Sequence, residues 1–244
     1  MLTPDEATAF RALSARANYL ALDRPDIAFA CKELCREFAQ PTRSSYAKLK
    51  RMGRYLKGRP RLVWDFPYQE ESKSTHLEVC VDTDFAGCQK TRRSTSGGAA
   101  RLGSHLIKAW SKTQSVVALS SGEAELTGIV RGASEALGLK SVAADLGQDW
   151  RITIYSDATA AIGICRRRGL GKIRHLAVAD LWVQDKVKNK EFGLEKILGA
   201  ENPADLLTKY LDGALQDKHV STLGLKFEEG RAASAPRLPK GDGG

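Results

Sequence analysis

Residues 76–82, with the sequence HLEVCVD, form the stretch that decides the fold. Leu77, Val79 and Val81 alternate with polar or smaller side chains, so the apolar side chains share one face. A period of two residues is typical of a half-buried β-strand. This strand would end at Asp82, which places a carboxylate at its carboxyl end.

The sequence after this strand predicts alternating strands and helices. Gly103-Ser104 lies between two strand-like segments and indicates a hairpin. A possible capping box at Ser120 and Glu123 opens a long helix. This order predicts an α/β fold, a mixed sheet flanked by helices. The expected elements are strands 97–102, 105–110, 151–156 and 193–198, and helices 120–138, 158–166, 175–188 and 203–210.

The sequence before this strand follows a helical pattern instead. Apolar residues recur at helical spacing in three segments: 5–22, 26–39 and 44–57. Residues 67–75, PYQEESKST, are polar and suggest a linker. We therefore expect a helical segment at 1–66, a linker at 67–75, an α/β domain at 76–212 and a C-terminal tail at 213–244 that is disordered from about 229.

The composition indicates an intracellular protein with a sizeable core. The 244 residues are 42% hydrophobic, and 38 Lys and Arg against 29 Asp and Glu give a net charge of +9. No apolar run approaches the ~18 residues that a membrane helix needs, and no secretory signal is recognisable. Five cysteines, an odd number, do not form a disulfide framework. We expect no membrane partner, and a cytoplasmic or nuclear location is left open.

The positive charge is concentrated in residues 42–61. This stretch holds eight Lys and Arg residues and no acid. It could be a solvated helix face or a surface that binds nucleic acid.

Four acidic residues occupy positions suited to a metal site. Asp82 and Asp157 follow strands, where ligand sites of open α/β sheets lie. Glu125 falls in the first turns of the long helix, and Asp205 in the first turn of the last helix. Clustered carboxylates need cations to neutralise them, and Mg²⁺ prefers oxygen ligands. Two such ions ~3.5–4 Å apart would support phosphodiester cleavage.

The residues around these acids resemble the ribonuclease H domain of copia-type retrotransposon Pol polyproteins. Four blocks occur in that family's order: VDTDFAGCQKTRRSTSG, LSSGEAEL, IYSDATAA and NPADLLTK. Upstream, NYLALDRPDIAFACKELCREFAQP and KRMGRYLKG resemble the family's connection between reverse transcriptase and ribonuclease H. The resemblance covers roughly residues 8–212 and implies a ribonuclease H-like fold.

The resemblance also implies a site and a substrate. It identifies Asp82, Glu125, Asp157 and Asp205 as catalytic, metal-binding acids for two Mg²⁺ ions, for which Mn²⁺ can substitute. Glu123 competes with Glu125, and we favour Glu125 because an apolar residue follows it. The implied substrate is the RNA strand of an RNA–DNA hybrid, and the implied partner is the polymerase part of the same polyprotein. The expected nucleic-acid contacts are Arg92, Arg93, Lys172, Arg174 and His175.

Two further interpretations remain beside this metal-dependent endoribonuclease. The chain contains no Tyr-x-Asp-Asp segment and no upstream palm, so we expect no DNA synthesis. It could therefore be a truncated, inactive relic that only binds nucleic acid. An integrase would carry an N-terminal His/Cys zinc module, and no such spacing occurs.

Overall fold

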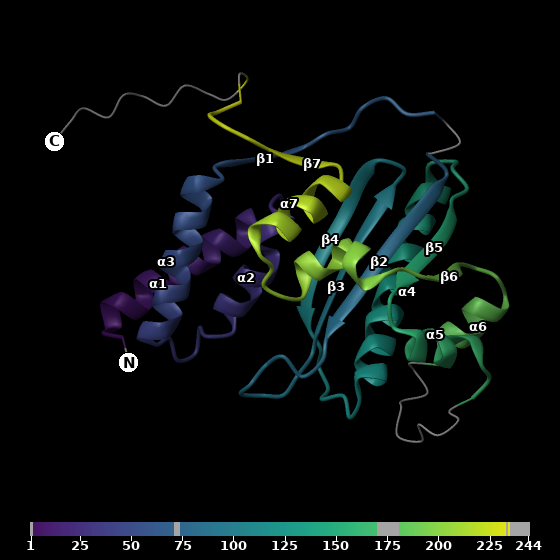
Figure 1. The fold of residues 1–244 in the computed structure, drawn as a ribbon, viewed down its shortest axis with the longest axis horizontal. Helices are drawn as coiled ribbons and strands as arrows, with labels where there is room; N and C mark the ends of the chain where they lie inside the picture. Colours follow the sequence, from purple (N-terminus) through teal and green to yellow (C-terminus); the bar gives the residue numbers. More distant parts are fainter. Residues whose placement is uncertain (1, 71–73, 170–180, 233, 235–244) are drawn as a thin grey trace.

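The computed structural model describes residues 2–70, 74–169, 181–232 and 234. A mixed sheet with helices on both faces forms the larger part, and three helices lie beside it (Figure 1). The elements are α1 (Pro4–Leu20), α2 (Pro25–Cys35), α3 (Arg43–Gly58), β1 (Arg61–Trp64), β2 (His76–Asp84), β3 (Thr95–Leu102), β4 (His105–Thr113), α4 (Ser121–Asp145), β5 (Arg151–Ser156), α5 (Thr159–Arg166), α6 (Trp182–Lys188), β6 (Gly193–Lys196), the 3₁₀ helices η3 (Gly199–Glu201) and η4 (Pro203–Leu207), α7 (Gly213–Thr222) and β7 (Leu225–Glu228).

The main sheet has five strands in the order β4-β3-β2-β5-β6. The first three strands form an antiparallel meander, and β5 and β6 continue the sheet in parallel with β2. Because β2 and β5 are parallel neighbours, their carboxyl ends lie at the same end of the sheet. The α/β class predicted from the sequence is confirmed.

Each face of this sheet buries its own apolar cluster. Leu77, Val79 and Val81 point towards α4 and pack against Leu126 and Ile129. This alternation is the one that the sequence of β2 predicted. The opposite face is covered by η4 and α7, and its cluster consists of Ala99, Leu106, Leu206, Leu207, Val220, Leu223 and Leu225.

The three N-terminal helices have a separate small core, centred on Phe10, Ile27, Cys31 and Leu34. A capping box at Thr3 and Glu6 begins α1, and a second at Thr42 and Ser45 begins α3. The helices are nevertheless attached to the rest of the molecule. Ala28, Leu62 and Trp64 pack against the apolar cluster on the sheet face that η4 and α7 cover.

Several elements differ from the sequence-based expectations. The region 213–228, expected to be tail, forms α7 and β7, and β7 pairs with the unexpected strand β1. The expected helix at 203–210 is the shorter 3₁₀ helix η4. The expected helix at 175–188 is described only from residue 181, and its helical part is α6. None of the described helices is long and apolar enough to cross a membrane.

Candidate active site

Asp82 and Asp157 lie next to each other at the carboxyl ends of the two parallel strands. The register pairs Cys80 of β2 with Tyr155 of β5, so both aspartates come two residues after a paired position. Asp82 is buried, and Asp157 is half-buried just beyond the end of β5. The strand ends therefore bring the two carboxylates together, as the sequence predicted.

Glu125 reaches the same place from the first turns of α4. Close packing of this helix on β2 depends on glycine. A Cβ atom on Gly128 would lie 2.5 Å from Thr83 Oγ1, and one on Gly132 would lie 2.5 Å from Val81 Cγ1. Both positions therefore let α4 approach the strand that ends at Asp82.

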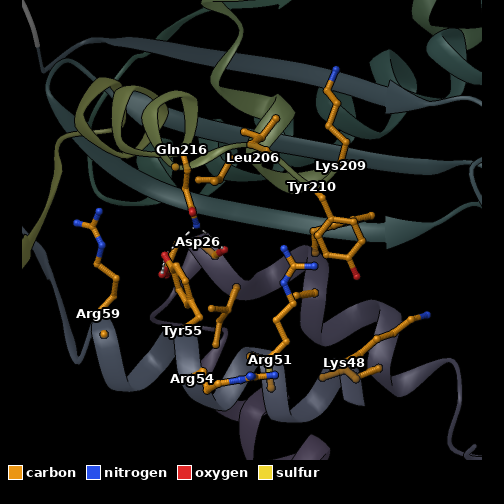
Figure 2. A pocket seen from close by; sticks show the side chains of 18 residues that line it. Asp26, Lys48, Arg51, Arg54, Tyr55, Arg59, Leu206, Lys209, Tyr210 and Gln216 are labelled. Carbon is orange, nitrogen blue, oxygen red and sulfur yellow. Dashed lines mark hydrogen bonds between the residues drawn. The ribbon is translucent and has the colours of Figure 1, made fainter. Parts of the chain in front are cut away.

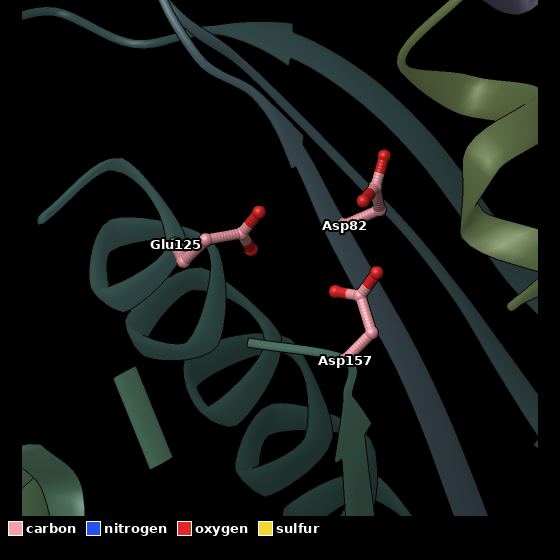
Figure 3. Close-up of side chains that lie close together, drawn as sticks. All are labelled: Asp82, Glu125 and Asp157. Atoms are coloured by element: carbon pink, nitrogen blue, oxygen red, sulfur yellow. The ribbon is translucent and has the colours of Figure 1, made fainter. Parts of the chain in front are cut away.

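The three side chains form an acidic triad, Asp82, Glu125 and Asp157. One carboxylate oxygen from each lies within 4.8 Å of those of the other two. Figure 3 shows them around one common space, with Glu125 coming from the helix and the aspartates from the strand ends. Three acids from distant parts of the chain thus form one oxygen-rich site.

Glu123, the competitor of Glu125, lies outside the triad and caps α4. Its carboxylate accepts hydrogen bonds from Leu119 N at 2.9 Å and from Ser120 Oγ at 3.3 Å. In return, Ser120 Oγ accepts from Glu123 N. The glutamate beside the aspartates is therefore Glu125.

Asp205 lies outside the triad and is connected to it through Lys209. The Lys209 Nζ atom is 2.9 Å from Asp205 Oδ1 and 3.7 Å from Asp82 Oδ2. The four predicted acids therefore do not form one equal cluster. Three converge directly, and the fourth is separated from Asp82 by a lysine ammonium group.

Two residues of the NPADLLTK block support the site: Asn202, which the sequence predicts only as a helix N-cap, and Thr208, to which sequence reasoning gave no role. Asn202 is completely buried, and its Nδ2 donates to the Val81 carbonyl at 2.9 Å. Its side chain also accepts from Ala204 N and so caps η4. The Thr208 hydroxyl donates to the carboxylate of Asp82. The signal for both was their place beside Asp205 in the quoted block.

The electrostatics of the site show uncompensated negative charge. Burial, together with the charges of Asp82 and Asp157, raises the pKa of Glu125 to about 8. Burial and Asp82 also raise the pKa of Asp157. For Asp205, burial raises the pKa to about 6, although the hydrogen bond from Lys209 acts in the opposite direction.

These residues fit a hard divalent cation. Glu125 Oε2 is buried and has no hydrogen-bond partner among the described residues. A buried carboxylate oxygen without a partner is costly, and a cation would satisfy it. The neighbouring donors are all carboxylate oxygens, which suit Mg²⁺ or Mn²⁺ better than a soft metal.

The remaining predicted contact residues lie in an exposed loop or outside the described residues. Arg92 and Arg93 are exposed in the loop that joins β2 to β3, close after Asp82 in sequence. Lys172, Arg174 and His175 lie outside the described residues.

The chain is similar to parts of plant proteins, and no protein-family model matches it. It is 35% identical over 126 residues to the uncharacterized mitochondrial protein AtMg00810 of Arabidopsis thaliana, a match that covers 52% of this chain and 51% of that protein. It is 29% identical over 225 residues to the retrovirus-related Pol polyprotein from transposon RE1 of the same plant, covering 90% of this chain and 15% of the polyprotein. The chain thus spans about half of the first relative and a small part of the second.

Among solved structures, the N-terminal RNase H domain of rv2228c from Mycobacterium tuberculosis, a fusion with maltose binding protein, is similar at 15% identity with a TM-score of 0.38. That match covers 61% of this chain and 99% of the other. The fold class follows from the sheet itself, because its strand order and directions are those of a ribonuclease H-like fold. The homologues of the chain are retrovirus-related Pol polyproteins from copia-type transposons, together with AtMg00810.

Proposed function

We propose that this chain is a metal-dependent endoribonuclease that cleaves the RNA strand of RNA–DNA hybrids. The observation that carries the proposal is the acidic triad, with one oxygen of each carboxylate within 4.8 Å of the others. Its buried oxygen without a partner and the raised pKa of Glu125 support a site that binds cations. The family supports a nuclease rather than another use of the fold.

Asp82, Glu125 and Asp157 would hold Mg²⁺ or Mn²⁺, with Asp205 as a fourth acid beside them. When bound, the metal pair supplies activation of a water molecule and stabilisation of the leaving oxygen. The chain's own residues fix the geometry. Thr208 orients Asp82 through its hydroxyl, and Lys209 holds Asp205 and offsets part of the negative charge.

The substrate must bring phosphate groups to this acidic end of the sheet. Arg92 and Arg93 are exposed and form no ion pair among the described residues, which suits them to backbone phosphates. Contacts by Lys172, Arg174 and His175 stay predictions. A hybrid is recognised through its shape and the 2′-hydroxyls in its minor groove. The polymerase part of a Pol polyprotein is the proposed partner that would deliver such a hybrid.

Cleavage of a labelled hybrid tests this proposal. The wild-type chain should cut the RNA strand with Mg²⁺ and lose this activity when the metal is chelated. Asp157→Asn should abolish cleavage, because it removes one carboxylate of the triad. A DNA duplex of the same sequence, which has no 2′-hydroxyls, is the substrate control and should stay intact.

The inactive relic is the second candidate, and the ion pair between Lys209 and Asp205 is the observation that favours it. A lysine ammonium group already offsets charge that a metal would otherwise neutralise. Salt-sensitive hybrid binding with no cleavage at any Mg²⁺ or Mn²⁺ concentration would establish this alternative and refute the endonuclease.

A further inference from the structure

A cleft of about 670 Å³ separates α2 and α3 from η4 and the start of α7. Lys48, Arg51 and Arg54 line the wall formed by α3, and Tyr210 and Gln216 lie on the opposite wall (Figure 2). Arg51 extends from α3 towards that opposite wall. The cleft therefore lies between the N-terminal helices and the segment that carries Asp205.

The cleft is positively charged. Its single lining acid, Asp26, is already engaged, because Arg24 donates to both of its oxygens and Tyr55 donates at 2.8 Å. Lys48, Arg51 and Arg54 are exposed, and none of them forms an ion pair among the described residues. Three unpaired cations along one helix face attract a polyanion.

The cleft adjoins the candidate active site through Lys209. Lys209 lines the cleft, and its ammonium group contacts Asp205 and Asp82. The next residue, Tyr210, is 67% exposed, and its ring packs edge-on against Phe29 at 4.9 Å between centroids. The surface thus runs from the acids, past a supported aromatic ring, to the cations of α3.

Direct contacts fix the position of α3 relative to the acids. Gln216 Nε2 donates to the Tyr55 hydroxyl at 2.8 Å, which joins α7 to α3. Just after α3, Arg59 forms an ion pair with Asp217 at 2.8 Å. On the neighbouring helix, Lys32 donates to Thr95 Oγ1 at 2.6 Å, beside the end of β2. A duplex on the acids would therefore meet α3 at a fixed distance.

We infer that α3 is a second phosphate-binding element, in which Lys48, Arg51 and Arg54 hold the backbone of the same RNA–DNA hybrid whose RNA strand lies at the acidic triad. The inference rests on the proposed function for the identity of the duplex. Its own evidence is the charge of the cleft and the position of Lys209 between the cleft and the acids. Because phosphate contacts carry no sequence information, this element would set affinity and position rather than sequence preference.

Equilibrium binding of a fluorescent hybrid without divalent metal tests the inference separately from cleavage. The triple variant Lys48→Gln, Arg51→Gln and Arg54→Gln should bind at least roughly tenfold more weakly at low salt. The slope of log affinity against log salt should become shallower by about 2 to 3, since each lost phosphate contact removes about 0.9. The charge-keeping variant Lys48→Arg, Arg51→Lys and Arg54→Lys should retain most of the wild-type affinity.

The matched control is Arg151→Gln, Lys188→Gln and Lys190→Gln, which removes the same charge. These exposed cations lie away from the acids: Arg151 begins β5, Lys188 ends α6, and Lys190 lies in the loop that leads to β6. The control should bind within about twofold of wild type, because it retains the proposed phosphate contacts. If the α3 variant binds like wild type or no more weakly than the control, the inference is wrong, and the charges of α3 form a solvated helix face.

The two proposals fail in different experiments. Weaker binding by the α3 variant, with no cleavage by the wild type, would support the phosphate-binding element and refute the endonuclease. Metal-dependent cleavage by the wild type, with unchanged affinity of the α3 variant, would refute only the phosphate-binding element.

Discussion

At the scale of single residues, the two glutamates at the start of α4 have different roles. One lies in the candidate active site, and the other stabilises the helix. Glu125 belongs to the acidic triad, whereas Glu123 caps the helix. They are two positions apart on the same helix, so each is a natural control for the other. The sequence context favours Glu125, because the apolar Leu126 follows it, and leaves Glu123 as its competitor.

We expect Glu125→Gln to lower the rate of hybrid cleavage by at least about a hundredfold, since metal assistance is worth several kcal/mol. Glu123→Gln should keep most activity and instead lower the free energy of unfolding by about 0.5–2 kcal/mol through the weakened cap. Single-turnover cleavage and urea unfolding measure the two effects. The opposite pattern would place Glu123 in the site.

The pKa of Glu125 also predicts how the stability of the metal-free protein depends on pH. This pKa is raised from 4.5 to about 8, so the folded state holds this proton more tightly than the unfolded state does. The stabilisation from its protonated form is complete below pH 4.5 and is lost as the pH rises towards 8. Urea unfolding in a chelator should therefore give lower stability at pH 8 than at pH 5.

The Glu125→Gln variant should flatten this dependence, and at pH 8 it should be more stable than wild type by at least about 1 kcal/mol. Added Mg²⁺ should stabilise the wild type at pH 8 and have less effect on the variant. A wild type whose stability at pH 8 does not respond to Mg²⁺ would contradict cation binding at the triad.

At the scale of elements, the packing of α4 on β2 determines where Glu125 lies. Gly128 faces β2 with no space for a Cβ atom, whereas Gly138 on the same helix has nothing within 4 Å of its Cβ position. The helix therefore contains glycines that close packing requires, Gly128 among them, and one, Gly138, that it does not.

Gly128→Ala should lower the free energy of unfolding by about 1–3 kcal/mol, because the added methyl group displaces α4 or β2. Cleavage should fall as well, since Glu125 would move away from Asp82. Gly138→Ala should be neutral or stabilise the chain by up to about 1 kcal/mol through helix propensity. If the two variants changed the free energy of unfolding equally, α4 would not pack on β2 as closely as the structure shows.

Elements with a strong periodicity of apolar residues were predictable from the sequence. Elements that form only through contacts with residues distant in sequence were not. The alternation in β2 and the long apolar stripe of α4 identify both elements and the face that each one buries. Strand β1 has only four residues and exists through its pairing with β7, which no local pattern reveals. The place of Lys209 between Asp205 and Asp82 likewise depends on the path of the chain after η4.

At the scale of the whole molecule, the C-terminal region is part of the fold. Val220, Leu223 and Leu225 are almost completely buried in the cluster that covers one face of the main sheet. The sequence analysis places a tail from residue 213, with small, polar, Pro- and Gly-rich residues from about 229. The apolar residues of α7 and β7 are few, so their burial became evident only in the folded structure.

A chain that ends after Asp212 should therefore be destabilised by several kcal/mol, since burial of each large apolar side chain contributes about 1.5–3 kcal/mol. Urea unfolding should show the effect. As a milder test, Leu223→Ala should cost about 2–5 kcal/mol, whereas the same change at the exposed Leu119 should cost less than about 0.5 kcal/mol. A truncated chain as stable as the full one would show that α7 and β7 are dispensable.

The pairing of β1 with β7 also sets an order for events during synthesis. Residues 61–64 leave the ribosome long before residues 225–228, so β1 has no partner until the rest of the described fold has been translated. Contacts between segments so distant in sequence form late, because closing a long loop costs entropy before the pairing repays it. The nascent helices and the nascent sheet can therefore take shape separately, and the β1–β7 pairing joins them further only when the final strand arrives.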